Sequence, residues 1–134
     1  MTELRRVNPE SLAAPRGFSH AVTAAGGTLV FLAGQTALDA SGRVVGDGIV
    51  AQVEQALTNL LAALAGAGGA PEHLAKVTIY AVDPEDYRAH AHEIGAVWKR
   101  LAGRDYPAMA LIGIVRLWDT EALVELEGIA VLPT

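Results

Sequence analysis

Apolar residues follow two different periods along this chain, and together they predict an α+β domain. Residues 48–64 and 83–101 repeat their apolar positions every three or four residues, as amphipathic helices do. In the first of these helices, Gln52 and Asn59 avoid the apolar stripe. Five further segments, rich in apolar and β-branched residues and bounded by turn residues, are typical of strands: 18–25, 28–34, 74–82, 108–117 and 123–132.

The order of these predicted elements is ββαβαββ. Gly26 and Gly27 separate the first two strands and predict a hairpin between them. Asp83 followed by Pro84 is the start signal of the second helix, as an N-cap and a first helical residue. The expected architecture is a five-stranded sheet with both helices on one face.

The other face of this sheet also needs a cover. Every residue from 29 to 33 is apolar, so neither face of that strand suits water. Hydrophobic residues make up 51% of the chain, which is high for a small domain. Two helices cover one face, and other copies of the same chain are the simplest source of a second layer. We therefore expect an oligomer with its ligand site at a subunit seam.

Length and composition favour one cytoplasmic domain. With 134 residues, the chain fits a loose N-terminal lead-in over residues 1–16 and a single domain over 17–134. The absence of cysteine excludes disulfides and thiolate metal sites. The N-terminus is polar and lacks the apolar core of a secretory signal.

Charge and hydropathy argue against two kinds of partner. The formal net charge is −5, and no cluster of Lys or Arg is present to neutralise phosphate, so we expect no nucleic-acid partner. Polar residues or glycines interrupt the apolar stretches before the ~18 residues that a membrane span needs, so we expect no membrane partner.

Two carboxylates in the last strand are the first candidates for chemistry. Glu125 and Glu127 share one face of an otherwise apolar strand. One of them is a candidate general acid or base beside a cleft. The alternative is that both lie at a strand edge or pair with Arg116 across the sheet.

The histidines and the missing motifs limit this chemistry. His20 shares a strand face with Phe18, as a candidate proton carrier or as a structural residue. His90 and His92 diverge on a helix and are expected at the solvated surface. No nucleotide-binding or metal-binding motif is present, so we expect no metal and no cofactor, only proton transfer and addition of water.

Several segments together resemble the Rid family, also called YjgF-like or RidA, of enamine/imine deaminases. The resemblance runs from Gly17 to Leu132. The segments that carry it are GFSHAV, TLVFLAGQTALDASGRVVG, IVAQVEQALTNLLAALAGAGG, LAKVTIYAVDPEDY, PAMALIGIVRL and LVELEGIAVL. It implies a chorismate-mutase-like fold and a homotrimer whose sheets line a central barrel, with clefts between subunits. It also implies cofactor-free hydrolysis of reactive imines or enamines to a keto acid and ammonia.

The resemblance assigns roles residue by residue. Gly34 matches a glycine that helps to hold substrate and water, Glu125 matches the glutamate that activates the water, and Phe18 matches an aromatic that closes the cleft. Met109 stands where the family has an arginine that grips the substrate carboxylate, and a helix-borne asparagine falls near Ala91.

The methionine changes the expected substrate. A thioether cannot form the bidentate contact of a guanidinium group, and it presents an adaptable apolar wall instead. With Phe18 and Leu111, Met109 would line a cleft for a less acidic or bulkier substrate, for which His20 is a candidate donor. Arg116 has the opposite strand parity and does not replace the arginine. The alternative function is a non-catalytic trimer that binds a small metabolite or acts as a scaffold.

Overall fold

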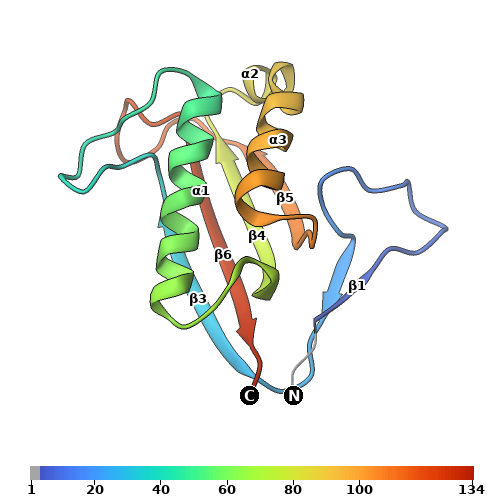
Figure 1. The fold of residues 1–134 in the computed structure, drawn as a ribbon. Coiled ribbons are helices and arrows are strands. Elements are labelled where there is room, and N and C mark those ends of the chain that lie inside the picture. Colours follow the sequence, from blue (N-terminus) through green and yellow to red (C-terminus); the bar gives the residue numbers. More distant parts are fainter. Residues whose placement is uncertain (1–3) are drawn as a thin grey trace.

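The fold is that of a computed structural model, which describes residues 4–134. These residues form six strands, three α-helices and one 3-10 turn. Figure 1 shows how they are arranged. In chain order these are β1 Arg5–Val7, β2 Ala21–Thr23, β3 Thr28–Gln35, α1 Ile49–Gly66, η1 Pro71–His73, β4 Leu74–Ala81, α2 Pro84–Ala89, α3 Ala91–Ala102, β5 Ala108–Gly113 and β6 Val124–Leu132.

Four of the strands form one mixed sheet. Their order is β3-β6-β4-β5, in which β4 and β5 are parallel and the other neighbours are antiparallel. Figure 1 shows α1 and α3 side by side over one face of this sheet. The predicted α+β class and the placement of the helices on one face are confirmed.

The predicted hairpin of the first two strands is wrong. β2 pairs with β1, through Arg5↔Thr23 and Val7↔Ala21, whereas β3 pairs with β6. Gly26 and Gly27 both have positive φ, at 75° and 93°, so the chain turns there without bringing its flanking strands together. The sheet therefore has four strands and not five. Part of the lead-in expected to be loose also forms a strand, while residues 1–3 lie outside the described residues.

Two predicted boundaries also differ. The helix expected over residues 83–101 is interrupted at His90, whose φ of −109° and ψ of 17° separate α2 from α3. Asp83 does cap α2, since its side chain accepts a hydrogen bond from the Asp86 amide at 3.2 Å. The strand expected over 108–117 ends at Gly113, so Arg116 lies in the loop between β5 and β6.

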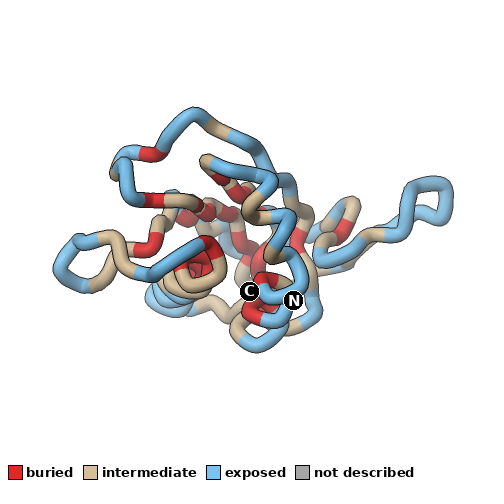
Figure 2. The backbone as a smooth tube through the Cα atoms, turned by 90° about the horizontal axis from the view of Figure 1, so that it is seen from above, coloured by how far each residue is buried: buried red, intermediate tan, exposed pale blue. Residues whose placement is uncertain are grey.

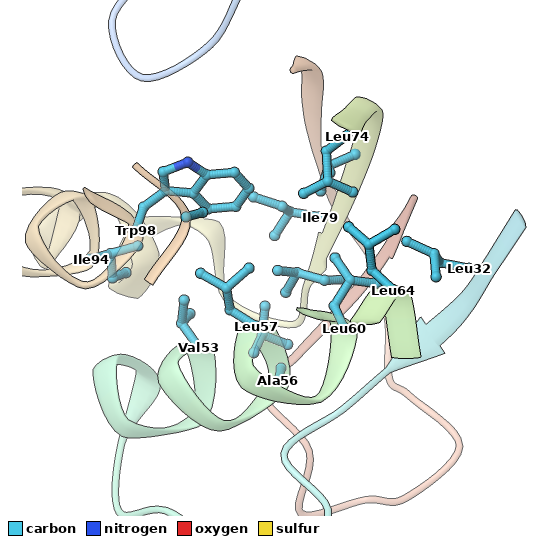
Figure 3. Close-up of a cluster of buried hydrophobic side chains, with 14 of the residues drawn as sticks. Leu32, Val53, Ala56, Leu57, Leu60, Leu64, Leu74, Ile79, Ile94 and Trp98 are labelled. Atoms are coloured by element: carbon cyan, nitrogen blue, oxygen red, sulfur yellow. The ribbon is translucent and has the colours of Figure 1, made fainter. Parts of the chain in front are cut away.

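The core lies between the helices and the sheet. Leu57, Leu60 and Leu64 of α1 are fully buried over β3 and β6, and Trp98 of α3 closes one side (Figure 3). Figure 2 shows buried backbone in the middle of the domain and exposed loops projecting from it. Although α1 has the length and composition that a membrane span would need, it fills this core with its apolar stripe.

The opposite face of the sheet carries exposed apolar side chains. Leu29 and Phe31 of β3 are 59% and 74% exposed. Ile129 is the partner of Phe31 in the register and lies beside it on the same face. We call this side of the sheet the open face. Leu29, Phe31 and Ile129 form its apolar part, and β3 is apolar on both sides as expected.

Candidate functional site

Glu125 lies beside a backbone irregularity in β3. The pairing between β3 and β6 shifts between Leu32 and Gln35, so Ala33 and Gly34 together lie opposite the single residue Glu127. Such a bulge leaves backbone groups outside the ladder and often lies beside active sites. A Cβ at Gly34 would overlap with Oε1 of Glu125, so the carboxylate is held directly over this glycine.

A second carboxylate and a phenol surround Glu125 on the open face. Tyr80 is the register partner of Glu125 and donates a hydrogen bond from its hydroxyl to Oε1 of Glu127 at 2.6 Å. Burial raises the pKa of the Glu125 carboxyl above its usual value, and the negative charge of Glu127 raises it further. Glu127 is held by a neutral donor, which leaves Glu125 as the carboxylate available for proton transfer.

A buried amide fixes the chain that leads into Glu125. Gln52 of α1 is only 4% exposed. Its Oε1 accepts a hydrogen bond from the Leu123 amide at 2.8 Å, and its Nε2 donates to the Glu121 carbonyl at 3.1 Å. The expectation that Gln52 avoids the buried stripe is therefore wrong, because a polar side chain can enter the core when backbone groups there satisfy it.

A second amide of the same helix holds the chain that follows Gly34. Asn59 donates from Nδ2 to the carbonyls of Thr36 and Leu38, at 3.0 and 2.8 Å. Both polar residues were missed as contributors to the site. Their signal in the sequence was weak, since polar residues beside an apolar stripe usually face solvent.

The other predicted site residues lie on the helix side of the sheet, at its β5 edge. Met109 is paired with Val77 and Leu111 with Ile79, which places both on the helix-covered face. They line a hollow of about 270 Å³ together with Phe18, Gly17, Ile79, Tyr87 and Ala110. Burial raises the pKa of Tyr87 to about 12, so this phenol stays protonated. We call this cavity the β5 hollow.

The chain segment before β2 forms the outer wall of this hollow. Ser19 bridges to Ala108 at the edge of β5, and its amide donates to the Pro107 carbonyl at 2.9 Å. Its hydroxyl donates to the Tyr106 carbonyl at 2.7 Å. These bonds fix the position of Phe18, the preceding residue.

The candidate residues therefore form two groups in one chain. Glu125 and Gly34 lie on the open face of the sheet, whereas Phe18, Met109 and Leu111 line the β5 hollow on the helix side. Neither Glu125 nor Gly34 is among the residues that line the β5 hollow.

The histidines and Arg116 are occupied elsewhere. His20 donates from Nε2 to the Ala13 carbonyl at 2.7 Å, and its ring packs edge-on against Phe18 without lining the β5 hollow. His92 is exposed as expected, while His90 is half-buried, with Nδ1 2.9 Å from the Asp86 carbonyl. Arg116 donates to the carbonyls of Leu117 and Trp118 in its own loop and not to the glutamates.

Across residues 4–134, no group of three or more His, Cys, Asp or Glu side chains lies close enough together to hold a metal ion. The site is thus built from a carboxylate over a strand bulge, exposed apolar strands and an apolar hollow at the sheet edge.

Comparison with known proteins assigns this arrangement to a family. The family model described as Endoribonuclease L-PSP matches residues 9–132, and the chain belongs to this family, which is also called the YjgF/Rid family. A RutC family protein of Synechocystis is 37% identical over 123 residues, covering 90% of this chain and 91% of that protein.

Two further relatives extend the comparison. A protein of Capra hircus named 2-iminobutanoate/2-iminopropanoate deaminase is 33% identical over 103 residues, which is 76% of this chain and 72% of the relative. The crystal structure of the Rid family protein YyfB from Yersinia pestis has a TM-score of 0.86 and 36% identity. That comparison covers 96% of this chain and 98% of YyfB, so the fold expected from the resemblance is confirmed.

Proposed function

We propose that this protein hydrolyses reactive imine or enamine intermediates and uses Glu125 to activate water. The observation that carries the proposal is the placement of the Glu125 carboxylate over Gly34, beside Glu127 and Tyr80 on the open face of the sheet. A carboxyl group whose pKa is raised toward neutrality is suited to both accepting and returning a proton. The deaminase from Capra hircus, a relative with 33% identity, supports this reaction class.

The reaction needs only water and a proton carrier. As water adds to the imine carbon, Glu125 takes a proton from it, and the proton is then passed to the substrate nitrogen. The resulting carbinolamine loses ammonia and leaves a carbonyl product. Backbone groups at the Gly34 bulge would orient the substrate, because they lie outside the regular ladder.

We further propose that the site is completed between copies in a homotrimer. Glu125 and Gly34 of one copy would face the β5 hollow of the next, since the two groups lie on different sides of one sheet. The exposed Leu29 and Phe31 would be buried in the same assembly.

The β5 hollow favours a substrate that has no carboxylate next to Met109. Phe18, Met109 and Leu111 present apolar surface, and none of the residues lining this hollow is charged. The substrate would therefore be less acidic at that end, or bulkier, than 2-iminopropanoate.

The direct test generates imines with an amino-acid oxidase and follows ammonia release with and without the protein. Wild type should accelerate release, and Glu125→Ala should reduce the acceleration by about 10²- to 10⁴-fold, as expected for loss of a general acid–base group. Glu127→Gln is the matched control on the same strand face, with an expected loss well below that of Glu125→Ala. Equal rates for wild type and Glu125→Ala would contradict the proposal.

The second candidate function is a non-catalytic trimer that binds a small metabolite or acts as a scaffold. The thioether of Met109 in the β5 hollow favours it, because the hollow then binds by apolar contact alone. Its signature is a ligand-dependent rise of the melting temperature without any ammonia release. Turnover that depends on Glu125 would rule it out.

A further inference from the structure

A second hollow adjoins the β5 hollow. It has a volume of about 170 Å³ and lies between α3 and the segment that precedes Ser19. Gly17, Tyr87 and Met109 line both hollows, so the two hollows share part of a wall. Its walls are aromatic and aliphatic and include Ile94, Trp98 and Tyr106. We call this second cavity the α3 hollow.

The α3 hollow has the size of an aromatic ring. An apolar protein cavity of about 150 Å³ takes up benzene. Gly95 of α3 lines this hollow, and a Cβ added at Gly95 would meet no atom within 4 Å. Met109 is unbranched and can shift to admit a group that extends from the β5 hollow.

A single cation lies at the wall of this apolar space. Arg16 is the one charged residue among those lining either hollow. It is exposed, and neither of the two ion pairs found within residues 4–134 involves it. A guanidinium beside an apolar cavity matches a ligand that is apolar at one end and carries a carboxylate at the other.

The segment that carries Arg16 is tied down at several points. The His20 amide donates to Oδ1 of Asn8 at 2.8 Å, and the His20 ring donates to the Ala13 carbonyl. On the other side of Arg16, Ser19 is bonded to the Pro107 and Tyr106 carbonyls. Gly17 turns the chain between these anchors with a φ of 75°. Arg16 therefore lies in a loop whose backbone is fixed by hydrogen bonds.

We propose that the α3 hollow is a binding site for the aromatic or bulky aliphatic group of a monocarboxylate, whose carboxylate is held by Arg16. Binding of such a ligand does not require that the protein turn it over. If the protein is an enzyme, the same site predicts that its substrate is the imine of an aromatic or branched 2-amino acid; this part of the proposal rests on the proposed function.

The first test measures binding of 3-phenylpropanoate and of its neutral isostere 3-phenylpropanamide to the purified protein by calorimetry. The carboxylate should bind about tenfold more tightly than the amide, and Arg16→Met should remove this difference. Arg16→Lys should retain part of it. Arg88→Met, an exposed arginine of α2 that lines neither hollow, should change nothing. Equal affinity of wild type and Arg16→Met for the carboxylate, or no binding by wild type, would overturn the proposal.

The second test fills the hollow. Gly95→Leu places a side chain into the open space and should lower affinity for both probes by at least about tenfold, since the ring then has no room. Ala96→Leu is the matched control, because Ala96 is the exposed neighbour on the same helix and lines neither hollow. Both variants should melt no lower than wild type, because leucine favours helix more than glycine does and about as much as alanine. If Gly95→Leu binds both probes as tightly as wild type does, the phenyl ring of the probe does not occupy the α3 hollow and the proposal is wrong.

Turnover separates this inference from the proposed function. If wild type binds 3-phenylpropanoate through Arg16 but releases no ammonia from any imine, the inference stands and the proposed function fails. If ammonia release depends on Glu125 but is the same in wild type and Arg16→Met for the imine of phenylalanine, the substrate class inferred here is wrong and the proposed function stands.

Discussion

The Glu125 carboxylate occupies the space in which a side chain at Gly34 would begin. The contact joins β6 to the bulge of β3, two elements that are far apart in sequence. A residue without a side chain is thus needed at position 34 for a steric reason, since Gly34 is not among the glycines with positive φ.

Gly34→Ala should therefore move Glu125 without straining the backbone. Because the carboxylate is the end of a flexible, half-buried side chain that can swing aside, the cost in unfolding free energy, measured by urea denaturation, should be at or below about 1 kcal/mol. The displaced carboxylate should also lose most of the Glu125-dependent ammonia release. Gly66→Ala, at the end of α1 in open space, is the control and should be neutral or stabilising by up to about 1 kcal/mol. A Gly34→Ala protein with the wild-type rate would contradict the contact.

Because its pKa is raised in the folded protein, Glu125 should make the free energy of unfolding fall as the pH rises. A carboxyl group whose pKa is higher in the folded than in the unfolded chain binds protons more readily when folded. Its contribution to stability is present below the unfolded value near 4.5 and is lost as the pH rises through the folded pKa. Glu125→Gln should remove this decline from the stability profile between acid and neutral pH.

Removing the negative charge of Glu127 should narrow the pH range over which Glu125 changes the stability of the protein. Glu127→Gln eliminates the second cause of the shift, so the pKa of Glu125 should fall toward its usual value but remain raised by burial. Titration of the Glu125 side-chain carboxyl carbon by NMR measures this directly. A Glu125 pKa that is the same in both proteins would show that Glu127 does not act on it.

Gln52→Leu should destabilise the protein although it makes the core more apolar. The substitution leaves the Leu123 amide and the Glu121 carbonyl without their partner, at a cost of about 1–3 kcal/mol for each unsatisfied group. Faster amide exchange at Leu123 should accompany the loss, because its amide is then free. Thr58→Ala, an exposed position on the same helix, should change the unfolding free energy by no more than about 0.5 kcal/mol.

Phe31→Asp tests the proposed assembly. Phe31 is 74% exposed in the single chain, so a charge there should leave the monomer folded but prevent burial of the open face against another copy. Sedimentation should show a trimer for wild type and monomers for the variant. Thr58→Asp, on α1 at the helix-covered side, should remain a trimer. A monomeric wild type would refute the assembly and, with it, a site shared between copies.

Much of the fold could be predicted because its signals are local. The stripe of α1, the cap at Asp83 and the alternation in β6 are each visible within a short window of sequence. The break at His90 could not be predicted, since the apolar spacing continues through it. The pairing of β2 with β1 was also missed, because β1 is a three-residue strand that begins with two arginines.

The sequence by itself determined that Glu125 and Glu127 share a face, that Met109 and Leu111 share a face, and that the strands are too apolar for water on either side. Alternation within one strand fixes these relations, because side chains point in opposite directions at successive residues. Only the tertiary structure decided that the two pairs lie on opposite faces of the sheet, through Val77↔Met109 and Tyr80↔Glu125. Register is a relation between strands, so no single segment contains it, and the same holds for Gln52, which is polar in sequence and buried in the fold.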